Sequence, residues 1–373
     1  MKIYYDENMP FAKEFFGGFG ELVPFSGRTL TAKQVSDADV LLVRSITKVN
    51  EELLHLNNRL IFVGTATIGV DHIDHEYLNK RNVTYTSAPG CNAISVAEYV
   101  LSALVVLAER HLFNVQQLTV GIVGAGNTGS RLSEKLLAMG IKCLLCDPLL
   151  AQSGDERDFV SLEQVLSCDV ISLHVPLTRE GEFPTFHLLD GKRLSQLSNE
   201  QILINACRGE VVDNNALLKL KQQGLKTKLV LDVWESEPNI LQPLISFVDI
   251  ATAHIAGYSL EGKARGSEML YLALCEQLKE TPKKQLNQFL PTSAIDRVEI
   301  KHDFSEVLLN QLVKMVYDVR RDDAIFRHQI NSQGFDYIRK TYPARREFSA
   351  ITVTLPKSAV DGVPHRLGFN KEP

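Results

Sequence analysis

The chain has 373 residues, which at roughly 150 residues per domain predicts two or three domains. Hydrophobic residues make up 45% of the sequence and charged residues 23%, a composition typical of a folded globular protein and not of a disordered or fibrous one. The formal net charge of -5 argues against nucleic acid or an anionic membrane as the main partner.

The start of the chain reaches polar and acidic residues before any long apolar run, so no secretory signal is expected. The most apolar segment, 99–108, is far shorter than the roughly 20 residues that cross a bilayer, and it predicts a buried helix. Cys143 and Cys146 have CxxC spacing but lack a second cysteine pair and a set of histidines. We therefore expect reduced thiols, no metal site and a cytoplasmic protein.

Short apolar runs alternate with helical patterns through the first three-quarters of the chain. Continuous apolar runs of this kind indicate parallel strands that are buried on both faces of a sheet. The predicted class is α/β, with a doubly wound parallel sheet. The runs are 40–43, 60–63, 119–123, 142–146, 170–173, 202–205 and 229–233.

A glycine-rich segment follows the run 119–123 and carries the pattern GxGxxG at Gly124, Gly126 and Gly129. The first glycine permits a tight turn, the second lets the backbone approach a pyrophosphate, and the third lets helix and strand pack closely. Asn127 and Thr128 would open the helix, whose N-terminus attracts the anion. The helical pattern then continues at Leu132, Leu136, Leu137 and Met139.

Asp147 follows the next predicted strand and lies 18 residues beyond Gly129. A carboxylate at this place would accept hydrogen bonds from the ribose hydroxyls of a dinucleotide and repel a 2′-phosphate. The segment therefore predicts a site for NAD rather than NADP.

Three polar residues follow strands in the second half of the chain: Arg208, Glu237 and His254. Loops at the carboxyl ends of parallel strands converge on one crevice. Hydride transfer from a hydroxyl carbon needs a group that exchanges the hydroxyl proton, and a histidine has the right titration range. A carboxylate would orient the imidazole and favour its protonated form. An arginine would hold a substrate carboxylate through its planar fork or polarise the forming carbonyl.

At this point the sequence resembles the D-isomer-specific 2-hydroxyacid dehydrogenase family over roughly residues 35–280. The matching motifs are 64–74, the glycine turn with Asp147, 174–178, 205–209, 232–238 and 254–257. The resemblance implies that Arg208 binds substrate, that Glu237 pairs with the acid/base His254, and that Asp232 lies near the nicotinamide. It also implies that Val175, Cys207 and Gly257 contact NAD, Val175 through its backbone.

Segments 2–10, 42–47 and 254–259 are similar to one subgroup of that family, which acts on a phosphorylated four-carbon hydroxy acid. The subgroup implies Ser45, Thr67 and Tyr258 as substrate contacts and a C-terminal domain that forms a homodimer. For the phosphate, Arg44 is one candidate, and the pair Arg345 and Arg346, reached from a partner subunit, is another. The alternative is that these arginines are solvated surface charges.

The family fold implies a flavodoxin-like substrate domain interrupted by the cofactor domain. We expect residues 1–95 and 257–285 in the first, 96–256 in the second, and a small α+β domain over 286–373. In that last part, residues 304–319 have a helical pattern and 350–355 alternate like a strand.

Other members of the family, such as a 3-phosphoglycerate dehydrogenase or a hydroxypyruvate reductase, remain alternatives. A non-catalytic NAD sensor of the corepressor type is an alternative from a different class.

Overall fold

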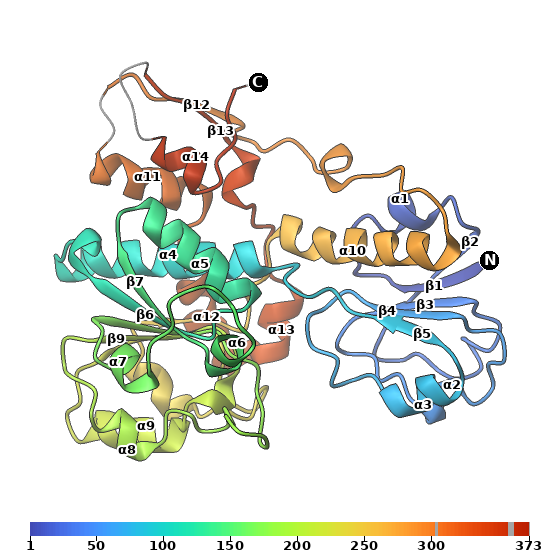
Figure 1. Cartoon of the computed structure of the whole chain (residues 1–373), viewed down its shortest axis with the longest axis horizontal. Helices are drawn as coiled ribbons and strands as arrows, with labels where there is room; N and C mark the ends of the chain where they lie inside the picture. The colour runs from blue at the N-terminus through green and yellow to red at the C-terminus, as the bar shows by residue number, and fades with distance from the viewer. Residues whose placement is uncertain (303–304, 357–361, 373) are drawn as a thin grey trace. The chain divides into compact units, whose positions relative to one another are not determined.

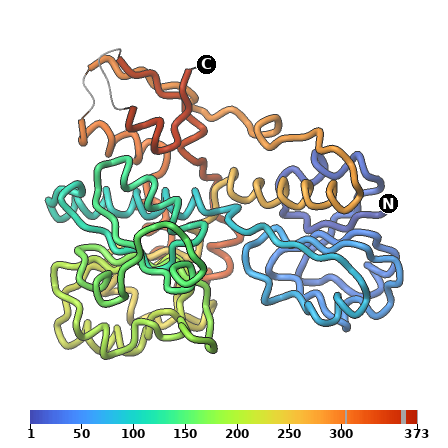
Figure 2. Tube along the Cα trace, in the orientation of Figure 1, coloured from blue at the N-terminus to red at the C-terminus, as the bar shows by residue number. Residues whose placement is uncertain are grey.

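The computed structural model describes residues 1–302, 305–356 and 362–372. The chain forms two compact units, one made of residues 1–92 and 259–292 and the other of residues 93–258 and 293–373. It therefore passes between the units three times, and Figure 2 lets the reader follow the trace by colour. The division into three domains stays a prediction.

The first unit has a parallel sheet of five strands in the order β2-β1-β3-β4-β5 (Figure 1). This order is that of a flavodoxin-like sheet, which confirms the predicted class of this part. Its strands are β1 (Lys2–Asp6), β2 (Glu21–Phe25), β3 (Val40–Val43), β4 (Phe62–Thr65) and β5 (Thr84–Thr86), and its helices are α1 (Ala12–Phe16), α2 (Glu51–Leu54), α3 (His75–Lys80) and α10 (Leu260–Leu278).

Two apolar cores lie on opposite faces of this sheet, because successive side chains of a strand point to opposite sides. Helices α1 and α10 supply Phe15, Phe16 and Leu270 to one core. Helices α2 and α3 supply Leu54 and Leu78 to the other. The segment 259–292 therefore completes a core that the first 92 residues begin.

The second unit has a parallel sheet of six strands in the order β11-β10-β9-β8-β6-β7. Beyond β7, Phe159 forms a single parallel bridge with Leu145, where a third strand of a nucleotide-binding fold would lie. The strand order reverses between β6 and β8, and this switch point is where ligands bind in such sheets. The strands are β6 (Thr119–Val123), β7 (Lys142–Cys146), β8 (Val170–Leu173), β9 (Ile202–Asn205), β10 (Lys228–Leu231) and β11 (Ile250–Ala251).

Helices cover both faces of this sheet, as the predicted class requires. Ile122 and Ile204 point into the core under α4 and α5, while Leu173 and Leu203 point into the core on the opposite face. The helices within residues 93–258 are α4 (Ala93–His111), α5 (Asn127–Ala138), α6 (Pro148–Gln152), α7 (Leu162–Leu166), α8 (Gly191–Leu194) and α9 (Asn214–Gln222). The predicted buried helix is confirmed as part of α4; Leu137, 59% exposed, does not belong to the apolar face of α5.

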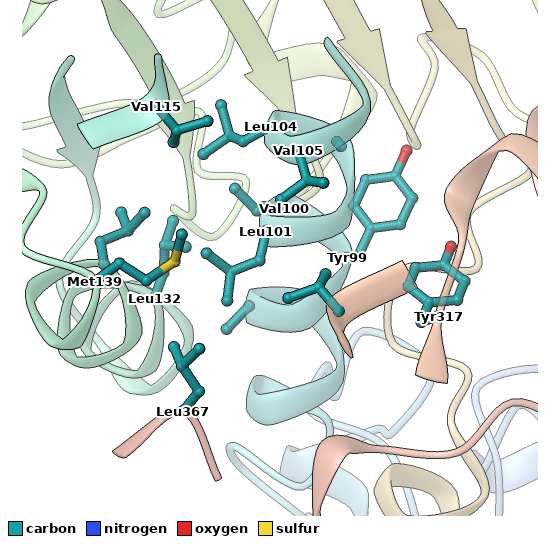
Figure 3. Close-up of a cluster of buried hydrophobic side chains, with 14 of the residues drawn as sticks. Tyr99, Val100, Leu101, Leu104, Val105, Val115, Leu132, Met139, Tyr317 and Leu367 are labelled. Carbon is teal, nitrogen blue, oxygen red and sulfur yellow. The ribbon is translucent and has the colours of Figure 1, made fainter. Parts of the chain in front are cut away.

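The C-terminal part of the second unit pairs two short strands in parallel, β12 (Arg297–Glu299) and β13 (Thr352–Thr354). Its helices are α11 (Glu306–Val316), α12 (Val319–Gln333), α13 (Phe335–Lys340) and α14 (Val363–Arg366). Tyr317 and Leu367 pack in the same core as α4 and α5 (Figure 3). Phe326 and Phe335 join the core on the other face of the six-stranded sheet. The last eighty residues thus share both cores of the nucleotide-binding fold.

The helical pattern over 304–319 is interrupted in the structure. Helix α11 ends at Val316, Tyr317 is extended, and Asp318 begins α12 by accepting a hydrogen bond from the Arg320 amide. Aspartate favours such N-terminal positions because it competes with the helix for backbone donors. Phe304 lies outside the described residues. Across the described ranges, no helix is long and apolar enough to cross a membrane.

Candidate active site

The glycine turn lies between β6 and α5, at the switch point of the six-stranded sheet. Gly124 has φ +91, and a Cβ there would lie 2.6 Å from the His174 carbonyl oxygen. A Cβ on Gly129 would lie 2.0 Å from the Gly124 oxygen, so only glycine lets α5 approach the strand this closely. A Cβ on Gly126 would meet nothing within 4 Å, which leaves open space beside the backbone where a pyrophosphate must approach.

Helix α5 begins at Asn127 directly after Gly126, and no side chain caps its first N–H groups. These groups and the positive end of the helix dipole suit a phosphate anion. Asp147, at the end of β7, accepts hydrogen bonds from the Leu150 amide and, at 2.9 Å, from the Ala125 amide. A carboxylate has about four acceptor sites, so Asp147 retains capacity for ribose hydroxyls. The cradle therefore fits NAD.

Arg157 also touches the glycine turn and carries no motif that the sequence would reveal. Its Nη1 donates to the Ala125 oxygen at 3.0 Å and to Ser130 Oγ at 2.8 Å. Asp155 binds the other side of the guanidinium, and its hydrogen bonds with Arg157 lower the pKa of Asp155 to about 2. The pair stabilises the turn from a loop that only the tertiary structure brings there.

The loops after β8 and β9 meet at Val175 and Cys207. Burial raises the pKa of the Cys207 thiol to about 11, and backbone hydrogen bonds from Arg208 and Val175 oppose this shift only in part. Asn205 shapes the second loop, since its side chain accepts from the Cys207 amide and donates to the Arg208 oxygen. Cys207 is thus a partly buried thiol whose raised pKa makes it unreactive.

Arg208 follows β9, and one of its N–H groups donates to the Cys207 oxygen at 2.7 Å. The next residue brings two loops into backbone contact, because a Cβ on Gly209 would lie 1.9 Å from the carbonyl carbon of Trp234. The backbone next to Arg208 therefore packs against the loop that carries Glu237, as expected for loops that follow neighbouring parallel strands.

Glu237 and His254 form a hydrogen-bonded pair across the ends of β10 and β11. Nδ1 of His254 lies 2.8 Å from Oε2 of Glu237, while Oε1 of Glu237 accepts from the Trp234 amide at 2.9 Å. Because a carboxylate only accepts, Nδ1 carries the proton and Nε2 is left with its lone pair. The His254 backbone has φ +55, a conformation uncommon for residues other than glycine and frequent at functional sites.

Asp232 stabilises the backbone conformation of His254 through the residues on either side of it. Its carboxylate accepts hydrogen bonds from the Thr252 hydroxyl at 2.6 Å, the Ile255 amide at 2.8 Å and the Ala256 amide at 2.9 Å. Burial raises the pKa of Asp232, and the nearby His254 opposes that shift. The loop that presents His254 is therefore folded around one buried carboxylate, a role that the strand-end position alone does not reveal.

His174 lies beside the glycine turn and is partly buried. Its Nε2 is 2.8 Å from Ser172 Oγ, and burial lowers its pKa to about 4. Its ring is thus neutral near pH 7 and is unsuited to exchange protons there.

Ser45, Thr67 and Arg44 belong to the other unit. Arg44 and Ser45 follow β3, and Thr67 follows the neighbouring β4, where its hydroxyl bonds to Thr65 Oγ1 at 2.8 Å. Because β3 and β4 pair in parallel, all three residues lie at the carboxyl ends of the strands of the five-stranded sheet. Their contacts with substrate stay a prediction.

The prediction that Arg345 offers an accessible charge for an anion is wrong. Arg345 is 2% exposed, its guanidinium lies 3.7 Å from the centroid of the Tyr317 ring, and it donates to the Ala256 oxygen at 3.0 Å. It also donates to the Ser95 oxygen. Arg345 fastens the C-terminal segment to the loop after His254.

Two other features of the second unit lie outside this site. A surface pocket of about 460 Å³ is lined by Cys168, Asp169 and Gln201, among others. These residues precede β8 and β9, so the pocket lies at the amino ends of the strands, opposite the end where ligands bind. Within the part of the chain that the structure describes, His187, Asp213 and Glu235 form the group that could hold a metal ion. His187 Nε2 already bonds to Glu235 Oε1 at 2.8 Å, and Asp213 caps α9.

The glycine cradle and the nucleotide-binding fold are those of an NAD-dependent oxidoreductase. The model of the family described as "D-isomer specific 2-hydroxyacid dehydrogenase, NAD binding domain" matches residues 105–256, and one described as a domain of unknown function (DUF3410) matches residues 289–368. The chain belongs to the D-isomer-specific 2-hydroxyacid dehydrogenase family.

Relatives are similar over the whole length. The erythronate-4-phosphate dehydrogenase of Colwellia psychrerythraea is 65% identical, with 100% of both chains covered, and that of Tolumonas auensis is 54% identical, with 99% of both covered. The solved D-lactate dehydrogenase of Aquifex aeolicus, complexed with NAD and lactic acid, is 28% identical at a TM-score of 0.60 and covers 75% of this chain and 96% of its own. The NAD-bound 3-phosphoglycerate dehydrogenase of Entamoeba histolytica, 24% identical, has the same fold at a TM-score of 0.63, over 78% of this chain and 99% of its own.

Proposed function

We propose that the protein oxidises 4-phospho-D-erythronate at C2 to 2-oxo-3-hydroxy-4-phosphobutanoate with NAD, a step in the biosynthesis of pyridoxal 5′-phosphate (vitamin B6). The observation that carries this proposal is full-length similarity to erythronate-4-phosphate dehydrogenases, including the segment beyond the cofactor-binding fold. The retained set of Arg208, Glu237 and His254 supports an enzyme rather than a non-catalytic NAD sensor.

His254 is the proton acceptor in this proposal. Nε2 removes the proton from the C2 hydroxyl, and the imidazole becomes positively charged. Glu237 fixes the ring through Nδ1 and stabilises this charge. NAD, held by the glycine turn, would supply the acceptor for the hydride from C2. Arg208 holds the substrate carboxylate so that the C2 hydroxyl lies against His254.

The cofactor contacts in this proposal follow the cradle. Gly124, Gly126, Asn127, Thr128 and Gly129 would bind the pyrophosphate, and Asp147 the ribose. The wall at the nicotinamide end would come from Val175, Cys207, Asp232 and Gly257. Asp232 would contribute through the His254 loop, whose amides its carboxylate binds.

Ser45, Thr67 and Tyr258 are the proposed substrate contacts, and Arg44 contributes affinity for the phosphate. Steady-state kinetics of Arg44→Ala with phosphorylated and unphosphorylated erythronate test the last point. A loss confined to the phosphorylated acid supports it, whereas an equal loss on both acids refutes it.

We also propose a homodimer that the C-terminal part mediates. Its helix α11 exposes Val307 (68%) and Met315 (38%), two apolar side chains of the kind that subunit contacts bury. Light scattering on a Val307→Glu, Met315→Glu variant tests the contact: a monomer is expected, and an unchanged dimer refutes it.

We also propose that the protein works in the cytoplasm. All six cysteines are free thiols, as in most proteins of that reducing compartment.

The experiment that tests the activity is a panel of 2-hydroxy acids with and without a 4-phosphate, followed by NADH absorbance at 340 nm. We expect 4-phospho-D-erythronate to have the highest kcat/KM. A preference for 3-phosphoglycerate or for reduction of hydroxypyruvate would replace this assignment with another member of the family.

A further inference from the structure

Helix α13, in the region matched by the domain of unknown function, brings an arginine to the loop that follows His254. Nη2 of Arg339 donates to the Tyr258 hydroxyl at 2.9 Å, and its guanidinium lies 5.6 Å from the centroid of the Tyr258 ring. Tyr258 is four residues beyond His254, and its amide closes a turn onto the Ile255 oxygen at 2.8 Å. All of these residues belong to the same compact unit.

Helix α13 is anchored by its own apolar side chains. Phe335 and Ile338 are buried in the core that also contains Trp234, which lies shortly before Glu237 in the chain. The Tyr342 ring also meets the Tyr258 ring edge to face, with centroids 5.9 Å apart. Two C-terminal side chains thus contact the Tyr258 ring, while Arg339, Tyr258 and His254 all remain partly exposed.

Among the residues that the structure describes, no ion pair neutralises the charge of Arg339, and its buried Nε has no hydrogen-bond partner there. Burial works against the cation, yet the fields of Tyr258, Glu237 and Asp232 raise the pKa of Arg339 above its usual value. A buried donor without a partner costs free energy, so such an arrangement persists where it has a use.

We propose that Arg339 is a positioning residue of the active site, which acts by fixing the Tyr258 hydroxyl against the anionic hydroxy-acid substrate. The inference rests on the proposed function, in which Tyr258 contacts substrate. It gives the C-terminal region a role in substrate binding by its own chain, in addition to any subunit contact. Cofactor binding and proton transfer stay with residues that Arg339 does not touch.

A double-mutant cycle tests this coupling. Wild type, Arg339→Gln, Tyr258→Phe and the double variant are compared by KM for 4-phospho-D-erythronate, kcat, NAD affinity by calorimetry, and melting temperature. We expect each single change to raise KM roughly 10- to 100-fold, the range for loss of a hydrogen bond to a charged group, with NAD affinity unchanged. The double variant should be no worse than the poorer single variant, because both remove one interaction.

Two further variants separate positioning from mere stability. Arg339→Lys keeps a cationic donor, so its KM should lie much closer to the wild-type value than that of Arg339→Gln. Arg321 makes a similar contact with another tyrosine, as its Nη2 lies 3.4 Å from the Tyr342 hydroxyl, so Arg321→Gln is the matched control and should keep the wild-type KM.

A wild-type KM in Arg339→Gln, additive effects in the cycle, or an equal rise in KM in Arg321→Gln would overturn the proposal. Where Arg339→Gln is too unstable to purify, the cycle is made with Arg339→Met, which removes the donor but keeps an aliphatic side chain, and additive effects there count equally against the proposal. The wild-type substrate panel decides the proposed function separately. If another 2-hydroxy acid is preferred, the cycle is run on that acid and the expected coupling is the same.

Discussion

Replacing Glu237 with glutamine tests how the carboxylate controls His254. The two oxygens of Glu237 have different partners: one accepts from the Trp234 amide at 2.9 Å and the other from His254 Nδ1 at 2.8 Å. A glutamine offers only one oxygen. If that oxygen keeps the Trp234 amide, the NH2 group faces Nδ1 and forces the ring proton to Nε2, where a base needs its lone pair.

The magnitude follows from the interaction that is lost. The bond to Glu237 joins two charged groups once His254 gains its proton, and hydrogen bonds to charged groups contribute roughly 1.5–3 kcal/mol. We therefore expect kcat to fall roughly 10- to 150-fold, at about 1.4 kcal/mol per tenfold change. The change should leave NAD affinity intact. Stopped-flow measurement of NADH formation, with calorimetry for NAD, gives both quantities.

The neighbouring Glu235 provides the matched control. It makes the same kind of bond, 2.8 Å to His187 Nε2, without touching His254. Glu235→Gln should therefore keep kcat within about twofold while it loses stability comparable to one hydrogen bond. Turnover of Glu237→Gln near the wild-type value, or an equal loss in Glu235→Gln, would refute the reasoning.

Three further changes give distinct readouts. His254→Ala should lower kcat roughly 10²- to 10⁴-fold with NAD binding retained; wild-type turnover would exclude it as the general base. Gly129→Ala should abolish NAD binding or folding in calorimetry and circular dichroism, since its Cβ would lie 2.0 Å from the Gly124 oxygen, and normal binding would contradict the cradle. Burial raises the pKa of Glu98 to about 7, only partly offset by Lys135, so the folded state binds more protons than the unfolded state between pH 4.5 and 7. Stability should thus fall as pH rises through this range, by at most roughly 3 kcal/mol. Melting curves should show this slope in wild type and a smaller one in Glu98→Gln; parallel curves would disprove it.

Local patterns predict most of the sheet in the second unit. The runs 119–123, 142–146, 170–173 and 202–205 form strands with those same bounds. Strands β6, β8 and β9 are largely buried, as near-continuous apolar runs indicate, whereas β7 is only partly buried. The glycine turn was equally predictable, since its spacing reflects contacts within one strand, turn and helix. A helix break such as that at Tyr317 is harder to see, because the apolar pattern continues across it.

By itself, the sequence determines the parallel sheets, the dinucleotide turn and the strand-end positions of Arg208, Glu237 and His254, since each depends on neighbours in the chain. Only the tertiary structure decides what surrounds them. Asp232 folds the His254 loop around its carboxylate, and Arg345 is a buried fastener instead of an anion site. Arg339 reaches Tyr258 across 81 residues of sequence. The physical reason is that burial and hydrogen-bond partners are set by which distant segments share a core, and no local pattern encodes that pairing.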